Sequence, residues 1–363
     1  MLRWASVSWT TVAAITFVLS LAATWLGIIY ATRRRLMDLP GRRRSHATPT
    51  PRGGGIGIIV GVFFSLIGFA GWSHTLGATI VAGLLAAIAL VALVGWIDDH
   101  RGLGAMPRIA AHAFATLLAL GVPAMIGLAY LPSHEVLPYA LACAVVFIAI
   151  VWSINLHNFM DGIDGLLALQ ALFVFAAIGA LFFHIEHRTE AACTALLVAA
   201  VAGFVPFNFP RARIFMGDVG SGVLGLLIAL VVLWQMSLPS IALASGIVLG
   251  SAFVIDATCT LLSRMLRGRR WYSAHREHLY QWLGRCGHSH TQVVALYMGW
   301  NLLIVLPVVC WMNRMPAAVA PGVALRSAGF GVATGVYAAG IALWWFGKRW
   351  CLRAIATRRR YAA

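Results

Sequence analysis

Long stretches without charge limit most strongly how this chain can fold. Residues 4–32 contain no Asp, Glu, Lys or Arg, and residues 53–97 contain none either. Because a helix needs about 20 apolar residues to cross a bilayer, the second stretch is long enough for two crossings. The chain is 61% hydrophobic and 10% charged, whereas a soluble domain carries about 25% charged residues. The sequence therefore predicts an all-α, polytopic integral membrane protein.

At about 20 residues for each crossing, the apolar stretches predict about eleven transmembrane helices. They are expected at residues 4–32, at two places within 53–97, and at 109–131, 137–156, 165–183, 191–207, 221–234, 241–262, 293–311 and 323–346. Arginines follow the first stretch, which indicates a retained helix, because a cleaved signal peptide carries its positive region first. An odd number of crossings places the two termini on opposite sides.

The basic residues of the predicted loops set the orientation. When the loops are assigned alternately to two sides, one side receives all of the 27 Lys and Arg residues except Arg3, Arg188, Arg314 and Arg326. Cytoplasmic loops carry the excess of Lys and Arg, so the basic side is cytoplasmic. The N-terminus is therefore expected outside and the C-terminus in the cytoplasm.

The few acidic residues gather on the predicted cytoplasmic side. The chain has 11 Asp and Glu residues, and a charge near lipid is costly and rarely kept without a use. Any one acid could pair with a cytoplasmic arginine, but that role explains a group of several acids less well. On or near this face lie Asp98, Asp99, Asp161, Asp164, Asp218 and Glu277.

Two segments place pairs of carboxylates close together in the sequence. GWIDDHRGL puts Asp98 and Asp99 at the cytoplasmic end of the third predicted span. Adjacent carboxylates there can hold Mg²⁺, position a phosphate through Mg²⁺, or act as a base. In NFMDGIDGL, the spacing of Asp161 and Asp164 would place both on one face of a helix. Gly162 between them lets backbone or ligand approach closely.

Two later segments combine basic residues with metal-binding or proton-transfer groups. In RARIFMGDVGSG, Asp218 lies in a glycine-flanked turn after Arg211 and Arg213. Hard oxygen ligands in a turn suit Mg²⁺, and arginines suit phosphate. In AHREHLYQ, His275 and His278 are expected on one helical face. Neutral rings there could move protons, and protonated rings could bind phosphate.

Asp256, near the inner end of the ninth predicted span, is open to two interpretations. It could be catalytic, or it could pair with Arg264, and the structural role is favoured. The neighbouring pattern HREH lacks the HExxH spacing, which argues against a zinc protease.

The order of several segments resembles a known family. They are PGRRRSHATPTPRGGGIG, GWIDDHRG, NFMDGIDGL, RIFMGDVGS and HREHLYQ. Together they resemble the polyprenyl-phosphate N-acetylhexosamine-1-phosphate transferases, the MraY/WecA-like enzymes, over residues 33–281. The predicted helix number and outside N-terminus look like WecA, and the loop WYSAHREHLYQ resembles WbpL-type enzymes that initiate O-antigen synthesis. MraY has consecutive histidines in this loop, whereas Arg276 and Glu277 separate them here, which argues against the peptidoglycan precursor.

The resemblance implies transfer of N-acetylhexosamine-1-phosphate from a UDP-sugar to undecaprenyl phosphate, with release of UMP, to initiate synthesis of a lipid-linked glycan such as O-antigen or lipopolysaccharide. It implies a multi-pass protein of the bacterial inner (cytoplasmic) membrane whose active site faces the cytoplasm. Residues 1–363 are expected to form one transmembrane domain. Its catalytic inner loops are expected near residues 31–55, 98–108, 157–165, 208–220 and 263–292.

The resemblance also implies how metal and lipid phosphate are held. Asp218 is the main ligand of Mg²⁺, or of Mn²⁺ in its place, and Asp99 is a further ligand. Asp98 and Asp99 bind or activate the lipid phosphate, and Asp98 is the candidate base.

The remaining matched positions are assigned to the UDP-sugar. Nucleotide and diphosphate binding falls to Asn158, Asp161, Gly162, Asp164, Arg211 and Arg213. Phe215 is expected to stack on uracil. Thr50 and the catalytic His275 and His278 complete the phosphate and sugar pocket. The sequence leaves open whether the sugar is GlcNAc, FucNAc, QuiNAc or another.

Two other classes of protein stay open. A transporter of nucleotide-sugars or lipid-linked sugars would place its polar site near the bilayer midplane and show repeated halves, whereas these acids lie at helix ends. A non-catalytic membrane scaffold would not need the acids together. The net charge of +16 fits anionic lipid or an anionic substrate, and the hydrophobicity argues against nucleic acid. A homodimer is compatible with the sequence.

Overall fold

Helices make up nearly all of the structure, a computed structural model that describes residues 8–38, 49–73, 77–120, 136–238, 241–269, 275–314 and 329–361. Within these ranges, the strands β1 (Met37–Asp38) and β2 (Thr50–Pro51) form one antiparallel pair with Asp38 opposite Thr50. The expectation of a mostly helical membrane protein is confirmed.

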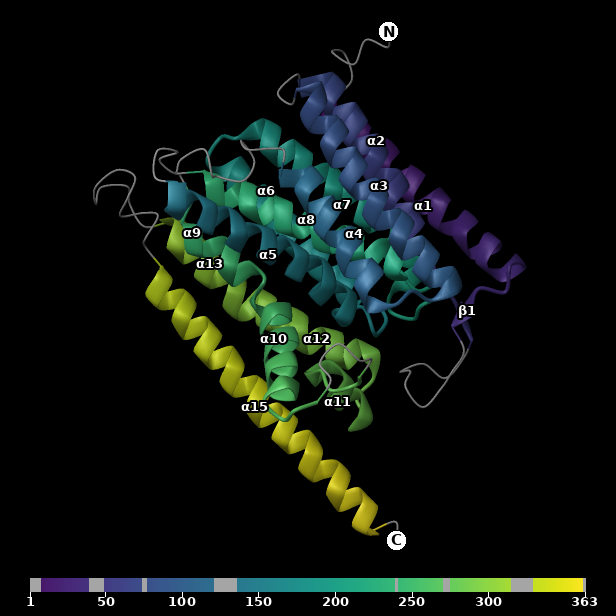
Figure 1. Cartoon of the computed structure of the whole chain (residues 1–363), viewed down its shortest axis with the longest axis vertical. Coiled ribbons are helices and arrows are strands. Elements are labelled where there is room, and N and C mark those ends of the chain that lie inside the picture. The colour runs from purple at the N-terminus through teal and green to yellow at the C-terminus, as the bar shows by residue number, and fades with distance from the viewer. Residues whose placement is uncertain are drawn as a thin grey trace.

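The helices pack into one bundle, with α15 along its outer edge (Figure 1). Their bounds are α1 (Trp9–Arg33), α2 (Gly55–Ser73), α3 (Ala78–Arg101), α4 (Ala105–Leu120), α5 (Val136–Met160), α6 (Leu166–His184), α7 (Arg188–Asn208), α8 (Asp218–Ser237), α9 (Leu243–Leu249), α10 (Ser251–Met265), α11 (Leu279–Arg285), α12 (His290–Trp300), α13 (Leu306–Arg314) and α15 (Phe330–Tyr361). A π-helical turn, Asn301–Val305, joins α12 to α13.

Eight described helices are long and apolar enough to cross a membrane. They are α1, α3, α5, α6, α7, α8, the continuous α12–α13 helix and α15. The pair α9 and α10, bent by 65°, adds a ninth if the two form one span. The apolar part of α2, Gly55–Ala70, is shorter than these spans. α4 ends at Leu120. Residues 121–131 of the fourth predicted span lie outside the described residues, as do Arg3, Arg326 and residues 39–48 and 270–274 of the predicted loops.

α8 lies in the interior of the bundle. Of its most apolar stretch 72% is buried, more than in any other candidate span among the described helices. It packs on α3 and α5, and small residues at such contacts let helices approach closely. A Cβ added at Gly95 of α3 would lie 2.4 Å from the carbonyl oxygen of Asp218. This close contact places the acidic end of α3 beside the first turn of α8.

The segment that follows α10 returns to the end of α5. The Tyr280 hydroxyl donates to the carbonyl of Phe159 at 3.0 Å, and the ring of His278 stacks on that of Phe159 with centroids 6.3 Å apart. α11 packs in turn against α15. Elements from distant parts of the chain therefore meet where the acids gather.

Candidate active site

Arg108, near the start of α4, joins three helices at the acidic site. Its Nη1 lies 2.8 Å from Oδ2 of Asp98 and 3.1 Å from Oδ2 of Asp218. Its Nη2 donates to Oδ1 of Asn158 at 3.0 Å, and Nδ2 of Asn158 donates to the hydroxyl of Ser221 at 2.9 Å. One guanidinium therefore lies between carboxylates of α3 and α8 and an amide of α5.

Asp99 points from α3 to the first turn of α8. Its carboxylate oxygens accept hydrogen bonds from the backbone amides of Asp218 and Val219, each at 3.2 Å. A carboxylate here satisfies amides that have no partner within the helix and interacts favourably with the helix dipole. The backbone carbonyl of Asp99 also accepts a hydrogen bond from Arg52. Asp99 thus fixes where α8 begins, and with it the position of Asp218.

Asp161 lies in the turn between α5 and α6, not on a helix. α5 ends at Met160 and α6 begins at Leu166, so the prediction of one helical face for Asp161 and Asp164 is wrong. Burial raises the pKa of the Asp161 carboxyl well above its usual range, and the charges of Asp218 and Asp99 raise it further. Asp161 is therefore an additional member of the acidic group.

Asp164 has different neighbours from Asp161. Its Oδ2 accepts a hydrogen bond from the amide of Ala212 at 3.2 Å and lies 3.2 Å from Nδ1 of His290. It thereby holds the loop that carries Arg211 and Arg213. Both arginines are exposed, and neither forms an ion pair with a described residue, so both are accessible to an anion.

His275 and His278 lie together, although not on one helix. α11 begins only at Leu279, so the prediction of a shared helical face is wrong, yet the ring centroids are 5.0 Å apart. Burial lowers the pKa of His275 to about 4, and the charge of Arg264, and that of His278 when it is protonated, add to this. Burial also lowers the pKa of His278. Both rings are therefore neutral at neutral pH, which suits hydrogen bonding and proton transfer.

Arg264 pairs with Glu277 rather than with Asp256, so that expected pairing is wrong. Glu277 also binds Arg269 at 3.0 Å. Burial acts to raise the pKa of Glu277, but the hydrogen bond from Arg269 and the charges of both arginines outweigh it, and the pKa is lowered. Glu277 is thus a salt-bridged acid outside the group around Arg108. Asp256 instead accepts hydrogen bonds from α11, α12 and α15.

A cavity of about 650 Å³ opens beside Arg108. Its polar lining comes from Arg108, Asn155, Asn158, His275, His278 and Gln281. Its apolar lining includes Ile109, Phe147, Ile148, Val151, Trp152 and Leu261. α5 contributes to both, and Ile148 on that helix is 64% exposed. One cavity therefore joins an apolar surface to a polar end next to the acids.

Thr50 and Phe215 are not among the residues that line this cavity. The Phe215 amide donates to the Pro51 carbonyl at 2.8 Å, and the Phe215 carbonyl accepts from the Gly54 amide at 2.9 Å. These bonds tie β2 to the loop that precedes Asp218. Gly162 is likewise outside the cavity lining. Of the predicted site residues, Asn158, His275 and His278 line the cavity. Asp98 and Asp218 are connected to it through Arg108, and the other predicted residues lie outside its lining.

The acidic group fits a divalent cation whose shell is completed by substrate. Within the described ranges, no group of three or more His, Cys, Asp or Glu side chains is placed to hold a metal ion by itself. Mg²⁺, however, is usually bound by one or two carboxylates together with water and substrate phosphates. Burial raises the pKa of Asp161, and repulsion from the charges of Asp218 and Asp99 raises it further. A bound cation would offset the repulsion among these carboxylates. These three carboxylates are hard oxygen donors of the kind that Mg²⁺ prefers.

Comparison with known proteins places the chain in a family. Residues 81–236 match the model of the family described as Glycosyl transferase family 4, a range that includes the acids around Arg108. The chain is also 30% identical, over 318 residues and 78% of each chain, to the decaprenyl-phosphate N-acetylglucosaminephosphotransferase of Mycobacterium leprae (strain TN). The chain belongs to glycosyl transferase family 4.

Two further relatives agree with membership of glycosyl transferase family 4. The undecaprenyl-phosphate alpha-N-acetylglucosaminyl 1-phosphate transferase of Yersinia pestis is 27% identical over 293 residues, 77% of this chain and 78% of that one. The phospho-N-acetylmuramoyl-pentapeptide-transferase of Symbiobacterium thermophilum is 31% identical over 290 residues, 74% of this chain and 84% of that one. The resemblance to polyprenyl-phosphate sugar phosphotransferases is thereby confirmed.

Arg108 is a site residue of this glycosyl transferase family 4 member that the sequence motifs did not predict. In the sequence, Arg108 was only one of the basic residues of a predicted cytoplasmic loop. A signal was present, because Arg108 lies near the start of an apolar helix, shortly after the Asp98–Asp99 pair. His290, which contacts Asp164, carried no comparable signal, because the sequence around it is typical of a solvent-exposed loop.

Proposed function

We propose that this chain transfers N-acetylhexosamine-1-phosphate from a UDP-sugar to undecaprenyl phosphate. A phosphate oxygen of the lipid forms a bond to the β-phosphorus of the UDP-sugar, and the bond from that phosphorus to the oxygen shared with the α-phosphate breaks. UMP leaves with that oxygen and the electron pair, and the product is undecaprenyl-diphosphate-sugar. The names of the mycobacterial and Yersinia relatives, which specify transfer of N-acetylglucosamine phosphate to a polyprenyl phosphate, support this reaction.

The observation that carries the proposal is Arg108 between Asp98 and Asp218 at the polar end of a cavity with an apolar wall. Phosphoryl transfer depends mostly on positioning and on neutralising charge. The apolar side suits the prenyl chain, and the polar side suits two anionic phosphate groups. A transporter or scaffold has no need for a guanidinium group held between two carboxylates beside such a cavity.

Several side chains have distinct proposed roles. Arg108 exchanges its carboxylate partners for phosphate oxygens when substrate binds. Asp98, freed from that ion pair, accepts the remaining proton of the lipid phosphate. Asp99 holds the start of α8 and thereby orients Asp218.

The UDP-sugar is proposed to occupy the polar side of the site. Asn158, His275 and His278 line that side of the cavity and have polar groups for the diphosphate and sugar. The exposed Arg211 and Arg213 bind phosphate, held in place through Asp164. Thr50, Gly162 and Phe215 border the nucleotide, with the ring of Phe215 on uracil.

Asp218 and Asp99, together with Asp161, are proposed to hold Mg²⁺, with Mn²⁺ as a substitute. When bound there, the ion neutralises negative charge on the diphosphate and the departing UMP. The protein supplies the carboxylates and holds them on α3, α8 and the turn after α5.

The proposal includes eleven crossings, with the site on the cytoplasmic face of a bacterial inner membrane. Eight helices pass the length and hydropathy criteria for a span. The bent pair α9–α10, the shorter α2 and α4 would supply the other three. The excess of Arg in alternate loops supports this orientation, and a nucleotide-sugar is available only on the cytoplasmic side. The product would begin a lipid-linked glycan of the O-antigen type.

Purified protein in detergent should release UMP from a UDP-N-acetylhexosamine only when both Mg²⁺ and polyprenyl phosphate are present. The three requirements follow from the paired substrates and the acidic group. A panel of UDP-GlcNAc, UDP-FucNAc and UDP-QuiNAc, each assayed with undecaprenyl and decaprenyl phosphate, identifies sugar and lipid. Full activity in excess EDTA, or UMP release without lipid phosphate, would contradict the proposal. Uptake of intact UDP-sugar into proteoliposomes without UMP release would favour a transporter.

Asp98→Asn tests the proposed base through its pH dependence. The second pKa of a phosphate monoester is about 6, so a growing share of the lipid phosphate carries its last proton as the pH falls toward that value. If Asp98 removes this proton, the variant should release UMP much more slowly than the wild type near pH 6. The difference in rate should be small near pH 9, where nearly all of the lipid phosphate is already deprotonated. The measurement is the rate of UMP release against pH with lipid and Mg²⁺ saturating. A deficit that is equal at every pH rules out the base role.

A further inference from the structure

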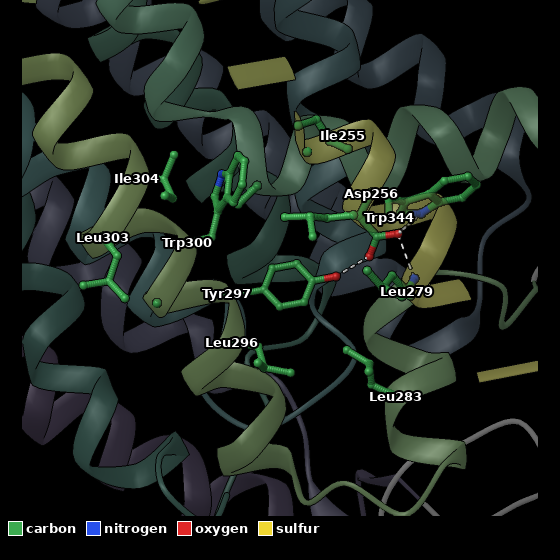
Figure 2. A pocket seen from close by; sticks show the side chains of 15 residues that line it. Ile255, Asp256, Leu279, Leu283, Leu296, Tyr297, Trp300, Leu303, Ile304 and Trp344 are labelled. Carbon is green, nitrogen blue, oxygen red and sulfur yellow. Dashed lines mark hydrogen bonds between the residues drawn. The ribbon is translucent and has the colours of Figure 1, made fainter. Parts of the chain in front are cut away.

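Asp256 on α10 is a buried carboxylate outside the proposed catalytic group. It is 2% exposed and lies at the wall of an apolar pocket of about 440 Å³, shown in Figure 2. Its oxygens accept hydrogen bonds from the Thr260 hydroxyl at 3.2 Å, the Leu279 amide at 2.8 Å, the Tyr280 amide at 3.4 Å, the Tyr297 hydroxyl at 2.6 Å and the Trp344 Nε1 at 3.0 Å. Burying an ionised carboxylate is costly unless it is well hydrogen-bonded, and this one is.

The donors to Asp256 come from helices that otherwise have separate places in the bundle. Tyr297 belongs to α12 and Trp344 to α15, and Figure 2 shows both side chains reaching the same carboxylate. The backbone donors belong to the first turn of α11. Asp256 therefore links α12 and α15 to the start of α11. All of these elements lie outside residues 81–236, the range that matches the family model.

The start of α11 leads directly to the active-site cavity. His278, the residue before α11, is buried and lines that cavity. Its Nδ1 lies 3.8 Å from Oδ1 of Asp256. Because the amide of Leu279 is fixed on the same Oδ1, the backbone that carries the imidazole is held within a narrow range.

A second contact leads from Asp256 to the turn that carries Asp161. The amide of Tyr280 donates to Asp256, and the Tyr280 hydroxyl donates to the Phe159 carbonyl. A Cβ added at Gly162 would lie 2.1 Å from that hydroxyl oxygen, so the phenol ring rests directly on the Asp161–Gly162 turn. The position of Tyr280 therefore affects both the end of α5 and the acidic turn.

We propose that Asp256 is a positioning residue for the transfer reaction, which fixes His278 in the cavity and Tyr280 against the Asp161 turn by anchoring the start of α11. Asp256 touches no substrate in this role and acts through these two side chains. The inference rests on the proposed function, because it assigns His278 to the substrate cavity. It gives α12 and α15, which lie beyond the matched family range, a part in arranging the site.

A double-mutant cycle between Asp256→Asn and His278→Ala tests this role. Asparagine keeps the size of the side chain but weakens the acceptor and introduces a donor among donors. A misplacement of about 1 Å can cost about 10²-fold in rate, so we expect Asp256→Asn to lower kcat/KM by about 10-fold to 10²-fold. In the His278→Ala background the same change should cost much less, because residues that act as a unit are not additive. Costs that simply multiply would overturn the link to His278.

The matched control is Asn301→Ala. Asn301 is a fully buried polar residue whose Nδ2 donates to Oε1 of Gln170 on α6 at 2.7 Å, and not to Asp256. Its removal should lower stability and leave the hydrogen bonds of Asp256 in place, so its effect on kcat/KM should be small and should multiply with that of His278→Ala. If Asn301→Ala showed the same dependence on His278 as Asp256→Asn, the role of Asp256 would be that of general packing.

Hydrogen–deuterium exchange of the peptide that covers residues 275–285 gives a readout that needs no activity. The amides of Leu279 and Tyr280 donate to Asp256, so Asp256→Asn should speed their exchange by about tenfold or more, because exchange reports local opening. Tyr297→Phe, a milder change, should speed it less. Unchanged exchange in both variants overturns the anchoring itself. If wild-type protein released no UMP from any UDP-sugar, the proposed function would fail while this measurement still decided the anchoring.

Discussion

Asp218→Asn should lower the maximal rate of UMP release by about 10²–10³-fold, the loss typical of removing one preorganised electrostatic contact to a developing charge. Asp218 begins α8 and shares Arg108 with Asp98, so its carboxylate lies where the proposed cation and the diphosphate would meet. Asparagine keeps the shape and one oxygen but loses the charge. The variant should therefore fold with an unchanged thermal midpoint, and the loss should appear in kcat rather than in expression.

A titration with Mg²⁺ separates the metal role of Asp218 from other roles. If Asp218 is a ligand, the variant should need a higher Mg²⁺ concentration for half of its own maximal rate. Glu186→Gln is a suitable control, because Glu186 forms an exposed ion pair with Arg188 away from the acidic group, and exposed pairs contribute little. Near wild-type turnover of Asp218→Asn at limiting Mg²⁺ would show that Asp218 is not a metal ligand.

The sequence could indicate the ends of helices at which the chemistry lies. Asp98 and Asp99 end a long apolar run, and Asp218 begins another, so membrane physics alone placed them at the boundaries of α3 and α8. Their spatial proximity could not be read in the same way. It depends on the contact of Gly95 with the carbonyl of Asp218, and one sequence without its fold does not show which helices are neighbours.

The turn at Asp161 and the hydrogen-bond partners of Asp256 could not be predicted from the sequence, for physical reasons. The spacing of Asp161 and Asp164 fits a helix, but the glycines around them favour a turn, and the structure has one there. The donors to Asp256 include Tyr297 and Trp344, which are 41 and 88 positions away along the chain. A polar residue on an apolar helix predicts that a partner exists, but only the packing of α10, α12 and α15 decides which residue it is.

Arg108→Ala should lower kcat/KM by about 10³-fold, the lower end of what an arginine contributes to phosphoryl transfer. The guanidinium reaches Asp98, Asp218 and Asn158 at once, and a planar fork can transfer these contacts to phosphate oxygens. Arg108→Lys keeps the charge but not the fork, and should recover only part of the loss. Arg101→Ala provides the control, because Arg101 is an exposed arginine at the end of α3. Similar kinetics for Arg108→Ala and Arg101→Ala would remove Arg108 from the mechanism.

A second substitution distinguishes binding of phosphate from mere compensation of the acids. Arg108→Ala leaves the carboxylates of Asp98 and Asp218 without their shared counter-ion. Two neighbouring negative charges then repel each other. If relief of this repulsion were the whole role of Arg108, adding Asp98→Asn would restore most of the activity at pH 9, where the lipid phosphate is deprotonated and loss of the base should cost little. If Arg108 instead neutralises substrate phosphate, the double variant should be no faster than Arg108→Ala, because the missing positive charge faces the substrate and not only the protein. Recovery to within about tenfold of the wild-type rate, a difference of about 1.4 kcal/mol in the barrier, would reduce Arg108 to a structural counter-ion.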